Sequence, residues 1–574
     1  MKQIPYGEIN FETIRTNNSI YIDKTSYIEK LEKDINLKKV LYLRPGRFGK
    51  SLFTDMLDYY YAIDHKEKFQ QLFGDLYIGK HPTINQNKYY ILKFDFSGID
   101  TTSEDTIKDM ENKFRQKVIE GTQTFKERYQ IQFEYNETMT PAAIIGNIFV
   151  AFKFQKPQQK IYVLIDEYDN FTNGILKENA DKFLNTVSGE GFVKSFYARI
   201  KEGVGAGVVD RFFATGIAPI TLDSMTTGFN IATDITRDQR FVSMIGLTKK
   251  EVQGLIKEVL PQKTEQEQEK IYEEMEIYYD GYRFSELNEE KTFNTTLVMY
   301  YLNYYVSIGT RPAKMLDRNI AANFEKLESL ITLKNNPYSK EVLESLIQNR
   351  EIAEEMTDKF NLAMDITKKD VLSILFYFGY CTIKEVKLGL KPSYCIPNYV
   401  MAGVYNEYFI QLLAREGIKI DTTKVDEAID QIALEGKIDK LCVLVEEYLS
   451  YIGNISWQKY DEKYVKSYMH ALLFLSPMYN TYLEFNVKNN RYIDVALFKI
   501  ENMGAKYQSI IEVKYIKKED AKTRKTKENA IKEKRNEAIE QIKAYIEDKR
   551  LPQEDMKKFI VIYVGQKLEF LEEV

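Results

Sequence analysis

Gly49, Lys50 and Ser51 are the first residues whose types and order could do chemistry. A P-loop binds nucleotide phosphates with a lysine, places a serine or threonine hydroxyl on Mg²⁺, and needs glycine where the backbone wraps the phosphate. The pattern here is incomplete, because Arg44 stands in the place of the first glycine and Gly46 comes two residues later. Such a tripeptide is common by chance, so a second group of residues has to support it.

Asp166 and Glu167 supply that support at the end of the apolar run KIYVLIDEYD. A P-loop ATPase needs a strand that ends in an acid for Mg²⁺, and a glutamate beside it can polarise the attacking water. Thr215 ends another apolar run, VDRFFATGIAP, where a polar side chain could sense the γ-phosphate. Solvated acids at a strand end are the simpler explanation, but acids at this end of an α/β sheet usually face a ligand crevice. The order of these groups along the chain therefore favours nucleotide binding.

Apolar runs separated by helical stretches must position these residues. A short run before the loop and helical spacing after it predict a strand, a tight loop and a helix. Strands that alternate with helices predict an α/β fold with a largely parallel sheet. Later the pattern becomes helical, and short apolar runs return near the end of the chain. We expect an ATPase core over 1–240, a helical lid over 241–290, a helical linker or scaffold over 291–454 and a separate α/β domain over 455–574.

Several segments of the first half resemble the AAA-ATPase-like proteins, a family found mainly in bacteria. The segments are RPGRFGKSL, VLIDEYD, FFATGIAPI, YIDKT and YDGYRFS, within residues 4–285. In that family the loop usually reads RPRRFGKS, so the missing first glycine is a family trait and Gly46 replaces an arginine. The resemblance implies an ASCE-type, AAA-like P-loop fold with a small helical lid, which would bind ATP with Mg²⁺.

The same resemblance assigns roles to single residues. Lys50 would bind phosphate, Ser51 and Asp166 would hold Mg²⁺, and Thr215 would be the γ-phosphate sensor. Arg283 could reach the γ-phosphate or be an ordinary surface or lid arginine, and both alternatives remain open. The expected nucleotide-site residues are Gly46, Arg47, Phe48, Gly49, Lys50, Ser51, Asp166 and Thr215, with Glu167 positioning water as the catalytic residue.

A second group that could do chemistry lies near the C-terminus. Glu512 and Lys514 are two residues apart in the apolar run YQSIIEVKYI, and side chains at i and i+2 of a strand share one face. Asp494, in the run RYIDVALFKI, could complete a metal pair from the neighbouring strand. Mg²⁺-dependent cleavage of a phosphodiester needs converging carboxylates and often a lysine near the attacking water. The alternative is a plain charge pair on a half-exposed strand.

This ordered set resembles the PD-(D/E)XK nuclease domain that commonly follows the ATPase in the same family, over about residues 455–565. Arg491, Gln541 and Tyr545 match further positions of that pattern. The resemblance implies a nuclease-like α/β domain that uses Mg²⁺, with Mn²⁺ as the other metal considered. The expected catalytic residues are Asp494, Glu512, Lys514 and Gln541.

An upstream acid usually joins Asp494 and Glu512 as a metal ligand in such a site. Glu484, on the preceding apolar run, is the first candidate, and Glu462 is the second. His470 resembles a family position, but a lone histidine on a helix is more often a core or surface residue. The identity of the third acid is therefore left open between the two glutamates.

Composition argues against several other classes of protein. The three cysteines show no paired spacing, which argues against a disulfide framework or a zinc site and favours a reducing cytoplasm. The longest apolar stretch is too short to span a bilayer, so no membrane partner is expected. The net charge of −5 does not indicate nucleic-acid binding by the whole chain. Lys517, Lys518 and Arg524 could contact a phosphate backbone, although solvated ion pairs are the favoured interpretation of that charged helix.

Two functions are consistent with these residues. The first is an ATPase coupled to a metal-dependent nuclease that acts on nucleic acid, with DNA favoured; a role in defence against foreign DNA is a guess from this pairing. The second is a nucleotide-dependent switch whose C-terminal domain binds a partner or nucleic acid without cutting. The unassigned upstream acid favours the second function, and the intact Asp494, Glu512 and Lys514 favour the first. A homo-oligomer is considered because a neighbouring subunit often supplies an arginine to the γ-phosphate.

Overall fold

The chain folds into two compact units, which we call the first and the second unit. The first contains Met1–Leu343 and Glu351–Met401, and the second contains Glu344–Arg350 and Ala402–Val574. The structure is a computed structural model. It describes residues 2–574 apart from 103, 137, 225–229, 313, 316–335, 358, 361–364, 388, 416, 419, 453–460, 477, 488–490, 501–502, 547 and 549–550.

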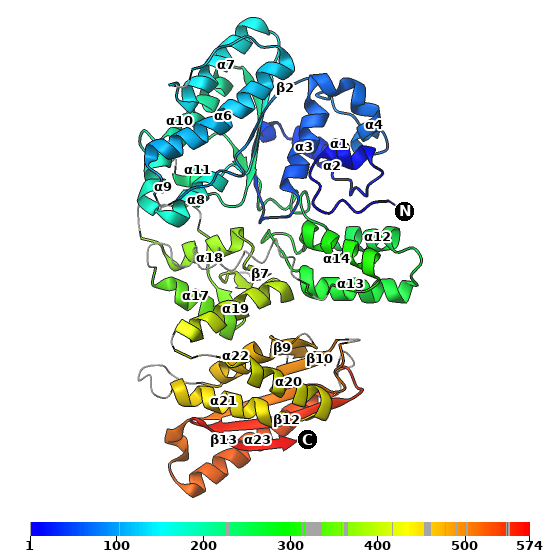
Figure 1. The fold of residues 1–574 in the computed structure, drawn as a ribbon, viewed down its shortest axis with the longest axis vertical. Coiled ribbons are helices and arrows are strands. Elements are labelled where there is room, and N and C mark those ends of the chain that lie inside the picture. The colour runs from blue at the N-terminus through cyan, green and yellow to red at the C-terminus, as the bar shows by residue number, and fades with distance from the viewer. Residues whose placement is uncertain are drawn as a thin grey trace. The chain divides into compact units, whose positions relative to one another are not determined.

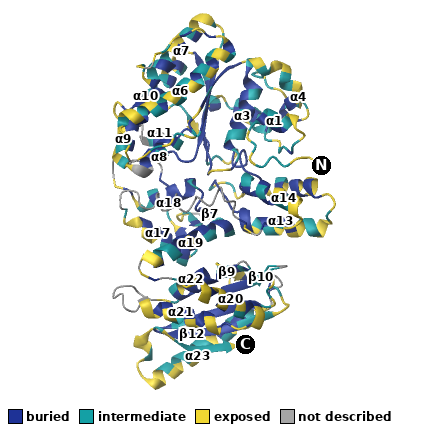
Figure 2. Cartoon of the chain, in the orientation of Figure 1, coloured by how far each residue is buried: buried dark blue, intermediate teal, exposed yellow. Residues whose placement is uncertain are grey.

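The first unit is built on a parallel sheet in the order β2-β3-β4-β1-β5. All six residues of β3 are buried, as expected for a strand covered on both faces. Figure 1 shows α1 to α4 on one side of this sheet and α6, α7 and α10 on the other, and Figure 2 shows the strands buried between them. The α/β fold predicted from the alternating pattern is confirmed. Its strands are β1 (Lys39–Leu43), β2 (Tyr90–Asp95), β3 (Ile161–Asp166), β4 (Val209–Gly216) and β5 (Thr233–Asp234).

Local sequence explains where several of the helices of the first unit begin. Thr106 caps one, and Asp109 completes a reciprocal capping box with it. Helices of this unit are α1 (Phe11–Thr16), α2 (Ser26–Lys33), α3 (Lys50–Tyr61), α4 (Phe69–Phe73), α5 (Tyr77–Lys80), α6 (Ile107–Tyr129), α7 (Pro141–Gln155), α8 (Asn170–Glu178), α9 (Ala180–Val187), α10 (Phe192–Gly205), α11 (Ile220–Ser224) and α18 (Lys368–Tyr377), with 3-10 turns at Ile35–Lys38 and Ile63–Lys68.

A helical layer follows the sheet within the first unit. It consists of α12 (Lys249–Val259), α13 (Glu265–Tyr279) and α14 (Thr295–Ile308). Leu255, Tyr272 and Tyr301, one from each helix, belong to a common buried cluster. The helices expected within 241–290 are therefore present, and α14, which lies in the expected linker, packs with them.

The second unit has a mixed sheet in the order β13-β12-β11-β10-β9. Strands β11 and β12 are parallel, and the other neighbours are antiparallel. A long helix, α23 (Arg524–Ile546), forms the crossover between the parallel strands, which such a connection requires. The strands are β9 (Tyr479–Val487), β10 (Arg491–Lys499), β11 (Gln508–Ile516), β12 (Met556–Val564) and β13 (Lys567–Glu573), and α22 (Glu462–Leu473) precedes them.

The expected linker over 291–454 does not form a unit of its own. Its first part packs in the first unit, while α20 (Thr422–Glu435) and α21 (Asp439–Ile452) pack in the second, where the Tyr563 hydroxyl donates to the Cys442 carbonyl at 3.1 Å. The first unit also has a small sheet of β6 (Ile352–Ala353), β8 (Ser393–Cys395) and β7 (Thr382–Glu385), whose strands are too short for the pattern to predict. The chain passes between the units within α17 (Tyr338–Gln348) and α19 (Tyr399–Arg415).

None of the helices in the described part of the chain has the length and apolar character needed to cross a membrane.

Candidate functional site

The loop 44–49 joins the end of β1 to the start of α3, as predicted for a P-loop. Gly49 has a φ of 105°, in the left-handed region that disfavours side chains, so glycine is needed there. Arg47 also has a positive φ, 70°. A Cβ built on Gly46 would meet no atom within 4 Å, and its φ is not in the left-handed region, so this position does not require glycine. The shape of the loop therefore depends on Gly49 rather than on Gly46.

Arg44, which stands where a first glycine is usual, anchors the loop from within the core. Its side chain is fully buried, and the guanidinium carbon lies 4.3 Å from the ring centroid of Tyr42 and 4.0 Å from that of Phe284. The guanidinium also donates to three backbone carbonyls at 2.8 to 2.9 Å. Arginine is suited to this position because its planar fork can bond several carbonyls and stack on rings. The three carbonyls belong to Leu43, Thr236 and Val242.

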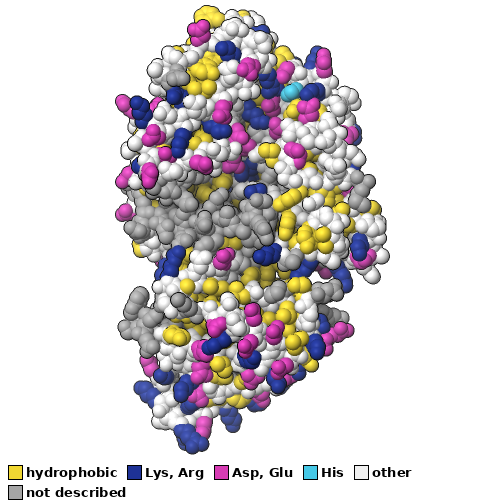
Figure 3. All heavy atoms as spheres, in the orientation of Figure 1, with side chains coloured by type: hydrophobic (Ala, Val, Ile, Leu, Met, Phe, Trp, Pro, Cys, Tyr) yellow, Lys and Arg dark blue, Asp and Glu magenta, His cyan; other side chains and the backbone are white. Residues whose placement is uncertain are grey.

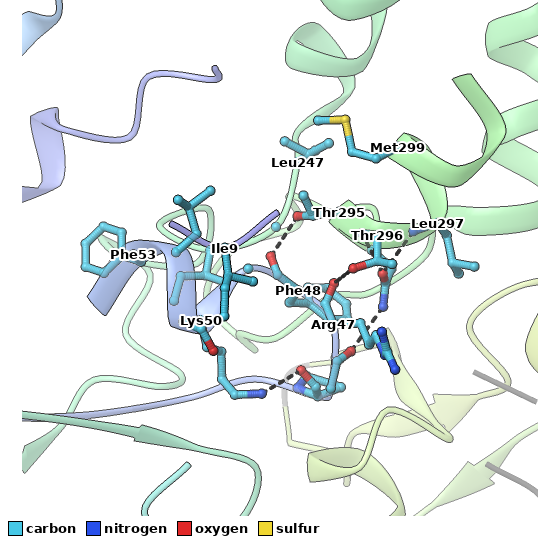
Figure 4. A pocket seen from close by; sticks show the side chains of 18 of the residues that line it. Ile9, Arg47, Phe48, Lys50, Phe53, Leu247, Thr295, Thr296, Leu297 and Met299 are labelled. Atoms are coloured by element: carbon cyan, nitrogen blue, oxygen red, sulfur yellow. Dashed lines mark hydrogen bonds between the residues drawn. The ribbon is translucent and has the colours of Figure 1, made fainter. Parts of the chain in front are cut away.

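Residues at the start of α14 hold the outer side of the same loop. Three successive side chains, Asn294, Thr295 and Thr296, each donate to one backbone carbonyl of the loop. The Thr295 hydroxyl makes the shortest of these bonds, 2.7 Å to the carbonyl of Phe48 (Figure 4). The other two carbonyls belong to Gly46 and Arg47. We call this set the α14 clasp. The sequence contains no motif that could have indicated it, because the partners are about 250 residues apart.

Four predicted residues come together at the end of the loop. The Lys50 ammonium lies 3.2 Å from Oε1 of Glu167 and donates to the carbonyl of Pro45 at 3.2 Å. Asp166 ends β3 and accepts a hydrogen bond from the Ser51 side chain. Burial, together with the neighbouring Glu167 carboxylate, raises the pKa of Asp166 to about 6. A lysine, a hydroxyl and two acids thus lie close together where β1, β3 and α3 meet.

Thr215 does not face this group. Its hydroxyl is fully buried and donates to the Tyr42 carbonyl at 2.8 Å, so it joins β4 to β1. In this structure Thr215 joins two strands, and its role as a γ-phosphate sensor stays a prediction. Asp169, the third acid of the predicted strand end, accepts from the backbone N–H groups of Ile217 and Ala218 and caps the turn after β4.

Arg283 lies in the segment expected as the lid and is not a surface residue. It is buried, and its guanidinium donates to the backbone carbonyls of Ser285, Glu286 and Asn288. This arginine therefore shapes its own loop. Phe48 is also structural, because its buried ring packs edge-on against Tyr282 and Phe284.

A cavity of about 510 Å³ lies beside the loop within the first unit. Lys50, Ser51 and Glu167 line it together with apolar side chains that include Leu247 and Met299. Figure 4 shows Lys50 at one end of this group and Leu247 and Met299 at the other. A volume of this size, apolar with a few polar groups, is typical of a site for a small organic ligand.

A second charged group lies in the second unit, at the centre of its sheet. Asp494 on β10, Glu512 on β11 and Lys514 on β11 are all buried. The Lys514 ammonium lies 2.8 Å from Oε1 of Glu512 and 3.9 Å from Oδ2 of Asp494. The backbone N–H of Val513 donates to Oδ2 of Asp494 at 2.9 Å. The structure thus brings together the three residues that the sequence singled out, and we call them the carboxylate site.

A second lysine reaches the carboxylate site from α22, and no motif in the sequence indicated it. Lys466 lies 2.5 Å from Oδ1 of Asp494 and 2.9 Å from Oε1 of Glu462. Burial and the Asp494 carboxylate raise the pKa of Glu512. Burial alone would lower the pKa of Lys514, but the carboxylates of Glu512 and Asp494 outweigh it and raise that pKa.

The two candidates for the upstream acid lie in different surroundings. Glu462 reaches the carboxylate site through Lys466, and its charge helps to raise the pKa of Lys514 against the opposing effect of burial. Glu484 lies across from Asp494 in strand register, but its φ of 54° interrupts the ladder. Burial lowers the pKa of Arg350 to about 10, and the charge of Glu484 partly offsets this. Glu484 therefore acts on Arg350, and Glu462 is the acid that joins the site.

The remaining predicted residues have distinct settings. The amide oxygen of Gln541 is buried and has no hydrogen-bond partner. The Tyr545 hydroxyl donates to the Tyr492 carbonyl at 2.6 Å. His470 lies 3.3 Å from the Thr481 carbonyl, and burial lowers its pKa to about 3, so it is a neutral core histidine. The charged helix α23 is solvated and carries pairs such as Arg524 with Glu528. Figure 3 shows basic and acidic side chains interspersed over one face of the second unit.

The carboxylate site offers the type of donor atom that a divalent cation binds. Asp494 and Glu512 offer the hard oxygen ligands that Mg²⁺ prefers, and Oε2 of Glu512 is buried without a partner. Among the described residues, however, no three His, Cys, Asp or Glu side chains are arranged as a ready metal site. Lys466 stands between Glu462 and Asp494, where a third ligand would have to approach.

Comparison with known proteins gives two matches to family models. The model described as a predicted AAA-ATPase matches residues 5–226, and that of the PD-(D/E)XK nuclease superfamily matches residues 460–573. An uncharacterized protein in the vnfD 5′ region of Azotobacter chroococcum mcd 1 is 23% identical over 426 residues, which cover 71% of this chain and 69% of that protein.

Two solved structures are similar to this chain at low identity. The Walker-type ATPase of Pyrococcus abyssi shares 13% identity with a TM-score of 0.38, over 67% of this chain and 94% of that one. The ORC2 protein of Aeropyrum pernix, solved as ADPNP and ADP complexes, shares 11% identity with a TM-score of 0.32, over 68% of this chain and 93% of that one.

Proposed function

Because the chain joins an AAA-ATPase-like domain to a PD-(D/E)XK nuclease superfamily domain, we propose that it hydrolyses ATP in the first unit and cleaves nucleic acid, with DNA favoured, in the second. The observation that carries the proposal is the meeting of a lysine with two acids at each of two separate places. Lys50 pairs with Glu167, next to Asp166, beside the cavity, and Lys514 lies near Asp494 and Glu512 at the centre of the second sheet.

In the first unit, ATP would place its phosphates over Gly49 and the start of α3. Lys50 would exchange its pair with Glu167 for the phosphates, which frees Glu167 to orient the attacking water. Ser51 and Asp166 are the residues that would hold Mg²⁺, and this metal would neutralise charge on the phosphates. The apolar part of the cavity, including Leu247 and Met299, has the character that an adenine base requires.

In the second unit, Asp494 and Glu512 would hold Mg²⁺ or Mn²⁺, with Glu462 as the further acid. The metal would polarise the phosphodiester and lower the pKa of bound water. Lys514, held by both carboxylates, would orient the attacking water and stabilise charge that develops on the phosphate. Gln541 has a free amide oxygen with which it could position that water.

The test uses the purified full chain and two variants, Lys50→Ala and Lys514→Ala. We expect Lys50→Ala to reduce ATP hydrolysis at least about 100-fold, and Lys514→Ala to reduce cleavage of plasmid or single-stranded DNA by a similar factor. Each variant should keep the other activity in the presence of Mg²⁺ or Mn²⁺. An exposed lysine on α22, Lys463, gives the control variant Lys463→Ala, which should keep both activities.

A nucleotide-dependent switch without cleavage is the second candidate. It is favoured by one observation, the lysine that lies between Glu462 and Asp494. Under this function, ATP hydrolysis persists while neither plasmid, single-stranded DNA nor RNA is cut with either metal. Cleavage that depends on Lys514 would exclude it. We also propose a role in defence against foreign DNA and a cytoplasmic location, as the setting in which such an activity would be used.

A further inference from the structure

The ammonium of Lys466 contacts two carboxylates in the second unit. Its ammonium lies 2.5 Å from Oδ1 of Asp494 and 2.9 Å from Oε1 of Glu462, and only 9% of its side chain is exposed. Glu462 and Lys466 are four residues apart on α22, so they share the face of the helix that meets β10. The helix therefore delivers one acid and one cation to the same place.

The oxygens of the carboxylate site are almost all engaged by the protein's own donors. Oδ1 of Asp494 is taken by Lys466, while Oδ2 accepts from the N–H of Val513. Oε1 of Glu512 is taken by Lys514, and Oε2 has no partner. A cation that bound between Asp494 and Glu512 would find Oε2 of Glu512 open and Oδ1 of Asp494 already occupied.

An ammonium that contacts a carboxylate oxygen repels a divalent cation that binds the same oxygen. A divalent cation binds oxygen at about 2.0 to 2.6 Å, so it would lie within a few ångströms of the Lys466 ammonium. In a buried site this repulsion is weakly screened. The negative charges of Glu462, Asp494 and Glu512 are also balanced in large part by the positive charges of Lys466 and Lys514. This lowers the attraction of the site for a further positive charge.

We infer that Lys466 is the resident counter-ion of the carboxylate site, and that a divalent cation binds there only after the ammonium has withdrawn from Asp494. The inference deepens the proposed function, because it rests on this site being the metal site of the second unit. Lys466 is a positioning residue under this inference, since it sets when metal can bind and does not itself touch the reacting atoms.

The test is Mn²⁺ binding to the full chain without nucleotide, measured by calorimetric titration. Lys466→Gln should bind Mn²⁺ about tenfold more tightly than the unaltered chain, because the competing charge is gone. Lys463→Gln makes the same change one turn away at an exposed position of α22 and should leave the affinity unchanged. Asp494→Asn should abolish the binding, which assigns it to this site.

A second measurement on the unaltered chain avoids dependence on the folding of a variant. Reductive methylation followed by mass spectrometry should label Lys466 several times faster when Mn²⁺ is present, because the ammonium has left its carboxylates. Equal or weaker Mn²⁺ affinity in a folded Lys466→Gln chain, unchanged labelling, or the absence of Mn²⁺ binding in every variant would overturn the inference. Tighter binding without any DNA cleavage would retain the inference and contradict only the nuclease proposal.

Discussion

The two sites place the same kinds of residue in opposite electrostatic settings. In the first unit the Lys50 pair includes Glu167, which is 20% exposed, and both residues line a cavity of about 510 Å³. In the second unit Lys514 and Glu512 are 4% and 1% exposed, and Lys466 adds a further cation. The first pair can exchange its partner for a ligand with little change in burial. The acids of the second site are already neutralised by lysines of the protein itself.

This difference has a physical consequence for stability. In the first pair Lys50 is buried but Glu167 is partly exposed, so the acid that remains when the lysine is removed can be solvated. Breaking a buried pair is far more destabilising, because the remaining charge stays in the interior. The two sites should therefore respond very differently when one lysine is removed, although both look alike in the sequence.

The largest expected effect is the contrast between Lys514→Met and Lys50→Met. We expect Lys514→Met to lower the free energy of unfolding by about 3 kcal/mol at about pH 9, where Glu512 is ionised in the unaltered chain and the variant leaves this buried carboxylate without its partner. Lys50→Met should lower it by less than about 1 kcal/mol, because Glu167 reaches solvent. Denaturant unfolding of the two variants beside the unaltered chain measures both values.

The control is the pH dependence of the difference in unfolding free energy between the two variants. Glu512 has a raised pKa in the folded protein, so the folded site prefers the protonated acid and stability is lost as the pH rises. Lys514 opposes this rise to about 8, so its removal raises the pKa of Glu512 further, and the defect of Lys514→Met should grow as the pH rises above about 8. Equal defects in both variants would show that the two pairs are equally buried in solution and would remove the distinction drawn here.

The next prediction concerns Asp166, whose pKa is raised to about 6, chiefly by burial. Mg²⁺ needs the ionised carboxylate, so the gain in nucleotide affinity that Mg²⁺ provides should be constant above about pH 7. Below pH 6 it should fall about tenfold for each pH unit. Affinity for a fluorescent ATP analogue, measured with Mg²⁺ and with a chelator between pH 5 and pH 8, tests this.

The contribution of Asp166 to the stability of the ligand-free protein changes with pH in the opposite direction. The unfolded chain loses the Asp166 proton at an ordinary value near 3.8, before the folded chain does. Stability without ligand should therefore fall as the pH rises from about 4 to about 6. A Mg²⁺-dependent affinity that stays level down to pH 5 would mean that Asp166 does not bind the metal.

The sequence could predict the β1 and β3 strand ends because apolar runs and their closing residues are local features. It also placed Asp494, Glu512 and Lys514 correctly as neighbours, since strand alternation decides which side chains share a face. It ranked Glu484 before Glu462, whereas in the structure Glu462 is connected to the site through Lys466. The reason is the left-handed backbone at Glu484, with a φ of 54°, which interrupts the ladder opposite Asp494 and which no periodicity reveals.

The α14 clasp could not be predicted for a related reason. Asn294, Thr295 and Thr296 are ordinary residues for the start of a helix, where they cap backbone N–H groups. Their additional bonds to the loop depend on how α14 packs with α12 and α13, which is set by apolar contacts far along the chain. Long-range packing, rather than local preference, thus decides which residues hold the phosphate loop.

A smaller effect is expected from Thr295→Val, which keeps the shape of the side chain and removes its bond to the Phe48 carbonyl. Loss of one hydrogen bond of this kind should weaken nucleotide binding by about 1 kcal/mol, or roughly fivefold, because the loop is less firmly held. Ser307→Ala, at an exposed position of the same helix, is the matched control. Equal affinity in both variants would show that the clasp does not support the nucleotide site.

The smallest effect on ATP hydrolysis is expected from Thr215→Val, and it separates two roles for one residue. The Thr215 hydroxyl donates to the Tyr42 carbonyl between β4 and β1, so its removal leaves a buried carbonyl without that partner. We expect the free energy of unfolding to fall by about 1 kcal/mol, while the rate of ATP hydrolysis stays within about twofold. Hydrolysis that falls 100-fold at unchanged stability would restore the γ-phosphate sensor that the sequence predicts. In that case β4 would have to move when nucleotide binds, and the first site would be less fully formed than its cavity indicates.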